Sequence, residues 1–85
     1  MLKRGQVVYS AAGHDKDSFY VVVDVLAGGF CTIADGRRRK FCRPKRKNQR
    51  HLRPTHSSVE LDGIGSDRAL RLALHQLCPT EPSED

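Results

Sequence analysis

The chain has 85 residues, a net charge of +5 and a pI of about 9.5. This length suits one small domain with a limited core, and the basic balance points to an anionic partner. No apolar run is long enough to predict a signal peptide or a membrane span, and Cys31, Cys42 and Cys78 form no close pair, so we expect a cytoplasmic chain with free thiols rather than a secreted or membrane protein.

Three short strands are predicted in the first part of the chain. Residues 5–13 (GQVVYSAAG) show the alternation of a half-buried strand, and residues 19–26 (FYVVVDVL) are dense in β-branched and aromatic residues. A turn at Gly28-Gly29 separates them from a third strand at residues 30–34 (FCTIA). The aromatic side chains are assigned to the core: Tyr9, Phe19 or Tyr20, Phe30 and Phe41.

The next segment, RRRKFCRPKRKNQRHLR at residues 37–53, holds ten of the fifteen Lys and Arg residues and no acid. The preceding Asp-Gly pair is typical of a tight hairpin turn, so residues 38–42 are predicted as a fourth strand that pairs with residues 30–34. Pro44 would end that strand, and residues 45–49 would form a loop. Residues 51–53 are predicted as a short fifth strand anchored by Leu52. The basic segment is therefore expected to be part of a folded surface rather than a tail.

The C-terminal part predicts one amphipathic helix. Ser66 is a plausible N-cap, and Asp67 suits the positive first turn. The apolar face would be formed by Ala69, Leu70, Ala73, Leu74 and Leu77. The predicted organisation is a barrel at 1–55, a linker at 56–65, a helix at 66–78 and a disordered acidic tail at 79–85. Four or five short strands followed by one helix indicate a mainly β protein, a small barrel with a C-terminal α-helix.

Several stretches of the first half resemble a known motif. The runs GQVV from Gly5, AGHDK from Ala12 and YVVV from Tyr20 resemble the KOW motif of ribosomal proteins and transcription elongation factors, although Asp17 stands where many such motifs have Gly. The continuation ADGRRRKFCRPKRKNQRHLRPT is similar to the fourteen-e type family of large-subunit ribosomal proteins and to small bacterial KOW-domain RNA-binding proteins. The resemblance covers residues 4–55. It implies an SH3-like barrel that binds structured RNA, usually ribosomal RNA, without catalysis.

A folded surface with this density of Lys and Arg gains affinity for RNA by releasing condensed counterions. Arg can also contact phosphate through two N–H groups or stack on an unpaired base, and amide side chains can reach 2′-hydroxyls. A solvated charged face with no ligand is the alternative, which the mutual repulsion of so many uncompensated cations disfavours. The predicted RNA-binding residues are Lys16, Arg37, Arg38, Arg39, Lys40, Arg43, Lys45, Arg46, Lys47, Asn48, Arg50, His51 and Arg53. Ribosomal proteins are expected as further partners.

Other functions are weighed against this one. The helix could dock on a partner in transcription or translation and make the chain a protein-interaction adaptor. Charge alone does not separate RNA from duplex DNA. A zinc site built from Cys31, Cys42, His51 and His56 lacks the close ligand pair typical of such sites, so no metal or cofactor is predicted. Cys31 and Cys42 are expected instead to be buried as small apolar groups. No carboxylate pair or phosphate-binding loop is present, and we predict no enzymatic activity.

Overall fold

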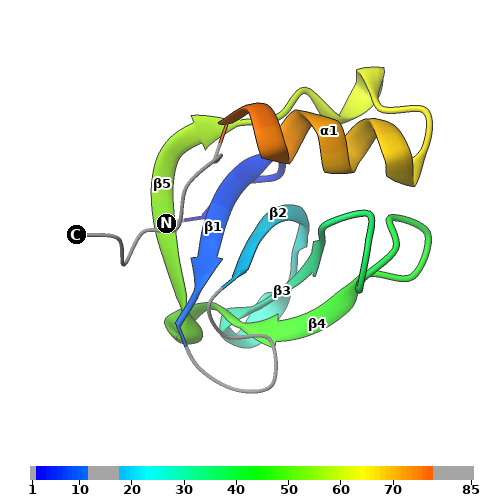
Figure 1. The fold of residues 1–85 in the computed structure, drawn as a ribbon. Helices are drawn as coiled ribbons and strands as arrows, with labels where there is room; N and C mark the ends of the chain where they lie inside the picture. The colour runs from blue at the N-terminus through cyan, green and yellow to red at the C-terminus, as the bar shows by residue number, and fades with distance from the viewer. Residues whose placement is uncertain (1, 12–17, 78–85) are drawn as a thin grey trace.

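The computed structural model describes residues 2–11 and 18–77 (Figure 1). Five strands form one antiparallel sheet in the order β4-β3-β2-β1-β5. The strands are β1 (Gln6–Ser10), β2 (Ser18–Val25), β3 (Phe30–Ala34), β4 (Lys45–Asn48) and β5 (Leu52–Ser58). The helical elements are η1 (Ala27–Gly29), η2 (Gln49–His51), η3 (Leu61–Gly63) and the C-terminal helix α1 (Asp67–Leu77). The predicted fold class, an SH3-like barrel of mainly β structure with a C-terminal helix, is confirmed. Lys16, Cys78 and the predicted acidic tail lie outside the described residues.

The sheet buries side chains on both of its faces. β1 pairs with β2 in the register Val7↔Val21 and Val8↔Tyr20, and all four side chains are fully buried. One face packs against α1 and the segment before it. Together they form a cluster of buried residues: Val7, Val21, Val23, Ala34, Val59, Leu61, Leu70 and Leu74. The other face lines the inside of the curved sheet: Leu2, Val8, Tyr20, Val22, Cys31, Ile33 and Leu52. This explains the unbroken apolar run of β2, which a one-sided sheet would interrupt with polar residues.

The prediction of a fourth strand at residues 38–42 is wrong. β4 begins only at Lys45, where a loop was expected, and it pairs with β3 from Ile33↔Lys45 to Phe30↔Asn48. Pro44 therefore precedes the strand instead of ending it. The backbone between β3 and β4 does not pair as a strand, because its N–H groups donate to acidic side chains instead. Those of Arg37 and Arg39 donate to the Asp35 carboxylate, and that of Phe41 donates to the Asp67 carboxylate.

The fifth strand is longer than expected. Leu52 is buried as predicted, but β5 continues past Arg53 to Ser58, which lies in the range predicted as a linker. Thr55 holds this extension through its hydroxyl, which donates to the Val7 carbonyl at 2.8 Å. Beyond the strand, Val59 and Leu61 are buried under α1, so the segment before the helix contributes to the core.

Helix α1 lies across one side of the sheet (Figure 1). Ser66 caps it as predicted, since its hydroxyl accepts a hydrogen bond from the N–H of Ala69 at 3.1 Å. Leu70 and Leu74 are buried, whereas Leu77, predicted on the same face, is 41% exposed. No helix in the described part of the chain has the length and apolarity to cross a membrane.

Candidate nucleic-acid interface

The loop between β3 and β4, residues 35–44, is held in shape by its own hydrogen bonds. The Asp35 carboxylate accepts from the backbone N–H groups of Arg37 and Arg39, each at 2.9 Å. The Arg39 carbonyl in turn accepts from the N–H groups of Asp35 and Gly36, and the Lys40 carbonyl accepts from that of Arg43 at 2.9 Å. Hydrogen bonds that nearby N–H groups donate to a short acidic side chain define a turn without a strand partner.

A second set of contacts fastens loop 35–44 to the first turns of α1. Gly36 is buried with φ +78°, and a Cβ at this position would collide with the carbonyl oxygen of Asp67. The Asp67 carboxylate accepts from the N–H of Phe41 at 2.7 Å, and Arg71 Nη1 donates to the Gly36 carbonyl at 3.1 Å. Phe41 itself packs against the core cluster under α1, as predicted for an inward side chain. The helix therefore fixes the loop that carries the first half of the basic segment.

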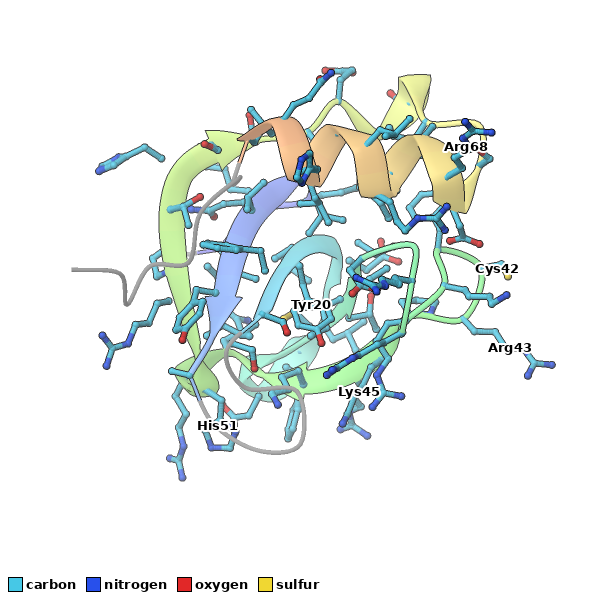
Figure 2. All side chains as sticks on the ribbon, in the orientation of Figure 1. Tyr20, Cys42, Arg43, Lys45, His51 and Arg68 are labelled. Carbon is cyan, nitrogen blue, oxygen red and sulfur yellow. The ribbon has the colours of Figure 1, made fainter. Side chains whose placement is uncertain are left out.

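The cations of this loop point into solvent. Arg37, Arg38, Lys40 and Arg43 are exposed, and Arg39 is half-buried. Figure 2 shows Arg43 directed away from the fold, on the side of the molecule where α1 begins. Within the described part of the chain, the four exposed residues have no acidic side chain as an ion-pair partner. Their charges are available to an external anion.

On β4 an arginine is stacked on an aromatic ring. The guanidinium carbon of Arg46 lies 4.3 Å from the centroid of the Phe30 ring, a cation–π contact. Arg46 is exposed and Phe30 half-buried, and Phe30 belongs to neither core cluster. The assignment of Phe30 to the core is therefore wrong: its ring supports a cation on the outer surface instead.

The polar residues at the end of β4 and the start of η2 make contacts within the protein. Lys47, predicted as an RNA-binding residue in a loop, lies instead on β4, where it is only 7% exposed and pairs with the buried Cys31. Asn48 caps η2 by accepting from the N–H of Arg50 at 3.0 Å. The Gln49 amide donates to the Phe30 carbonyl at 3.3 Å. These contacts fix the short connection from β4 to β5.

The basic residues thus follow one continuous path along the chain and the fold. It runs from loop 35–44 along β4 and η2 to the start of β5, and His51 lies at the far end of β4 from Arg43 (Figure 2). We call this surface the basic arc: Arg37, Arg38, Arg39, Lys40, Arg43, Lys45, Arg46, Arg50, His51 and Arg53. Lys47 is left out because its side chain is buried.

The two described cysteines differ in environment. Cys31 is fully buried, and its burial raises the pKa of the thiol. Cys42 is exposed between Phe41 and Arg43, which corrects the expectation that both thiols pack as small apolar groups. Among residues 2–11 and 18–77, no three His, Cys, Asp or Glu side chains gather closely enough to hold a metal ion.

A comparison with known proteins places the chain in a family. No family model matches the sequence. Over 70 residues, however, it is 31% identical to the large ribosomal subunit protein eL14 of Methanococcus maripaludis, and the match covers 82% of this chain and 84% of the relative. The chain belongs to the eL14 family. The predicted resemblance is confirmed, and the match is longer than residues 4–55, so the similarity to eL14 also includes residues beyond the predicted barrel.

Two cations of this eL14-family fold were missed by the sequence reasoning. Arg68 and Arg71 are exposed on α1, and Arg71 contacts loop 35–44 directly. Their spacing of three residues puts them on one side of the helix, and this was the available signal. In the sequence the two residues lie on a helix separate from the basic segment, and only the fold brings the first turns of that helix against the basic loop.

Proposed function

We propose that this chain is an RNA-binding protein of the translation apparatus, which contacts structured ribosomal RNA in the cytoplasm through the basic arc and catalyses no reaction. Membership of the eL14 family supports the association with the large subunit. The observation that carries the RNA contact is the fastening of loop 35–44 to α1, because it turns a run of cations into a fixed array.

A fixed array matters for affinity as well as for specificity. RNA binding releases counterions from the phosphates whether or not the protein is ordered. A loop that is already ordered avoids the entropic cost of ordering it on binding, so more of that gain remains as affinity. The Asp35 and Asp67 carboxylates order the loop through its backbone, because both accept hydrogen bonds from backbone N–H groups of the loop.

The members of the basic arc have different roles in this proposal. Arg38 and Arg43, exposed on the loop, bind phosphates. Arg46, stacked on Phe30, presents a flat guanidinium on which an unpaired base can lie. Asn48 uses its carbonyl oxygen in the η2 cap and keeps its amide group for a 2′-hydroxyl. Lys16 lies outside the described residues and remains a predicted contact.

The adaptor function is less well supported. It required the leucine face of the helix to dock on another protein, but Leu70 and Leu74 are buried in the domain's own core. Removing them from that core to bind a partner would expose the apolar surface that holds α1 on the sheet. The helix therefore serves chiefly to position the basic loop.

The proposal is tested with a pair of charge-matched variants. Arg38→Ser/Arg43→Ser removes two cations from the basic arc, and Lys3→Ser/Arg4→Ser removes two from elsewhere on the surface. We expect the first variant to bind a labelled ribosomal RNA hairpin more weakly and with a shallower salt dependence, and to co-sediment less with large subunits at moderate salt. The control should behave like the parent, since the exposed pair Arg4–Asp62 contributes little stability.

Two outcomes would contradict the proposal. Equal losses of affinity in both variants would mean that only net charge matters. Competition by duplex DNA as strong as that by the RNA hairpin would mean that the surface does not distinguish RNA from DNA.

A further inference from the structure

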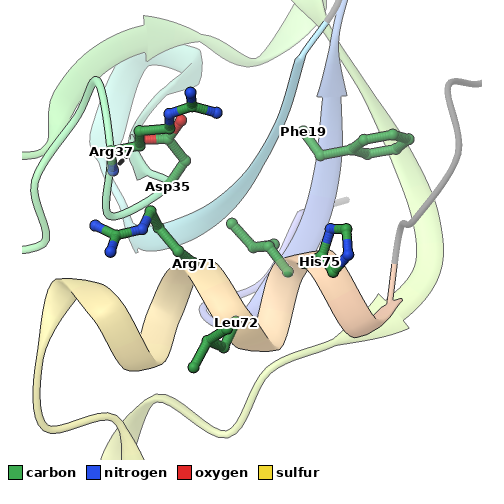
Figure 3. A pocket seen from close by; sticks show the side chains of 7 residues that line it. Phe19, Asp35, Arg37, Arg71, Leu72 and His75 are labelled. Carbon is green, nitrogen blue, oxygen red and sulfur yellow. Dashed lines mark hydrogen bonds between the residues drawn. The ribbon is translucent and has the colours of Figure 1, made fainter.

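A pocket of about 340 Å³ lies where α1 faces the loop and the start of β2 (Figure 3). This volume falls at the lower end of the range of about 300–1,000 Å³ found for small-ligand sites. Its lining comes from three parts of the chain that are far apart in sequence: Phe19 of β2, Asp35 and Arg37 of the loop, and α1. The pocket thus exists only because the loop and the helix are held together.

One end of the pocket is cationic. Arg37 and Arg71 both line it, and Figure 3 places them on the same side, with Asp35 beside Arg37. The bond from Arg71 Nη1 to the Gly36 carbonyl takes only one of its five N–H donors. One carboxylate oxygen of Asp35 is occupied by two backbone N–H groups. Two guanidinium groups against one carboxylate leave this end with a net positive charge.

The other end is aromatic and apolar. Phe19 and His75 lie on the side of the pocket away from the two arginines, and Leu72 and Leu74 complete the lining (Figure 3). The Phe19 ring is tilted against the ring of Tyr9 at 5.5 Å, which fixes its orientation. A flat apolar group is the ligand that such a wall accepts best.

We propose that this pocket binds one unpaired nucleotide of the RNA that the basic arc holds, with its phosphate at Arg37 and Arg71 and its base against Phe19, Leu74 and His75. This inference rests on the proposed function. A nucleotide matches both ends, because it joins a charged phosphate to a flat base that stacks on aromatic side chains. Continuity supports the same occupant, since Arg37 belongs both to the arc and to the pocket. An acidic peptide would use the arginine end and leave the aromatic end unfilled.

The test compares two RNA hairpins of equal length, one fully paired and one with a single bulged adenosine. Stacking of one base predicts that the parent protein binds the bulged hairpin about tenfold more tightly. The double variant Leu72→Ala/His75→Ala truncates two exposed side chains of the pocket and should bring the ratio of the two dissociation constants close to one. Gln76→Ala, an exposed neighbour outside this pocket, is the matched control and should keep the parent's ratio.

Titrations followed by NMR separate the ligand classes. Adenosine monophosphate should shift the ring protons of Phe19 and His75, whereas inorganic phosphate should affect only the arginine end. Shifts of these rings with a polyglutamate peptide but not with the nucleotide would overturn the proposal in favour of an acidic protein partner.

The outcomes also separate this inference from the function on which it rests. If the parent binds both hairpins equally and the double variant has the same dissociation constants, the pocket binds no nucleotide and the inference is wrong. RNA binding by the basic arc would still stand. If the parent binds neither hairpin at low salt, the proposed function itself is wrong.

Discussion

Gly36 packs directly against the first turn of α1. Its positive φ is costly for any residue with a side chain, and its missing Cβ leaves room for the Asp67 carbonyl. We predict that Gly36→Ala lowers the free energy of unfolding by more than about 2 kcal/mol, measured by urea unfolding, since strain and collision add.

Gly29→Ala is the control for that measurement. Gly29 has nearly the same φ, +80°, but no atom lies within 4 Å of the position of its Cβ. Gly29→Ala should therefore lower the free energy of unfolding only by the backbone strain, about 1–2 kcal/mol. Similar losses of unfolding free energy in Gly36→Ala and Gly29→Ala would mean that loop 35–44 does not pack closely against α1.

Arg46 tests the value of a stacked guanidinium. We predict that Arg46→Lys, which keeps the charge but loses the flat group on Phe30, weakens RNA binding about two- to fivefold at constant salt, because an unpaired base stacks on a planar guanidinium but not on an ammonium group. Arg53→Lys is the control, because Arg53 is exposed on β5 and has no ring contact among the described residues. Fluorescence anisotropy gives the dissociation constants for RNA. An equal rise in both variants would show that the stacking of Arg46 on Phe30 makes no contribution of its own to RNA binding.

Leu52 and Lys47 show how far single residues could be assigned from the sequence. Leu52 is an apolar residue among charged ones, so its burial followed directly from its type. Lys47 is a cation like the exposed Arg46 beside it, and only the pairing of β4 with β3 places it opposite Cys31. Its burial depends on a register set by residues distant in the sequence, and no local pattern could reveal it.

Among the elements, β1, β2, β3 and α1 were predictable and β4 was not. The first three strands have β-branched and aromatic residues in runs bounded by turns, and α1 has a leucine face with a cap. β4 has the sequence KRKN, without apolar alternation, and the Asp-Gly pair before it suggested a tight hairpin. Tertiary contacts override that local preference: Asp35, Gly36 and Phe41 are all engaged with the loop or with α1. The sequence therefore predicted which segment carries the candidate site and that it is folded, but not the path of its backbone.

Asp67 connects the helix to the loop, and its removal should loosen both. We predict that Asp67→Ala costs about 1–2 kcal/mol of unfolding free energy, because the Phe41 N–H loses its acceptor and the helix loses a favourable charge in its first turn. Amide exchange at Phe41 should accelerate in the same variant. Asp62→Ala removes an equal charge from an exposed position and should cost less than about 0.5 kcal/mol. Unchanged protection of the Phe41 amide would show that the contact with Asp67 does not hold the loop.

At the scale of the whole molecule, salt should act in opposite directions on stability and on binding. The crowded cations of the basic arc repel one another in the free protein, and ions screen that repulsion over about 10 Å at 0.1 M. We predict that raising the NaCl concentration from about 0.05 to about 0.5 M increases the Tm by a few degrees while it weakens RNA binding. Circular dichroism and anisotropy measure the two effects.

The variant Arg38→Ser/Arg43→Ser provides the comparison for this prediction. With two fewer cations in the arc, its Tm should rise less with salt than that of the parent. A Tm that falls with salt in the parent would mean that attractive ion pairs outweigh the repulsion, contrary to the arrangement described above.

The order of the sheet leaves β4 and β5 as its two outer strands, joined only by the three residues of η2. Outer strands of this kind invite pairing with another copy of the chain unless charge or proline prevents it. Here one carries Lys45 and Arg46 and the other carries Pro54. We expect the free chain to stay monomeric, because Pro54 on one outer strand and the cations on the other both oppose self-pairing; on β4 the side chains proposed to hold RNA would thus also guard against aggregation.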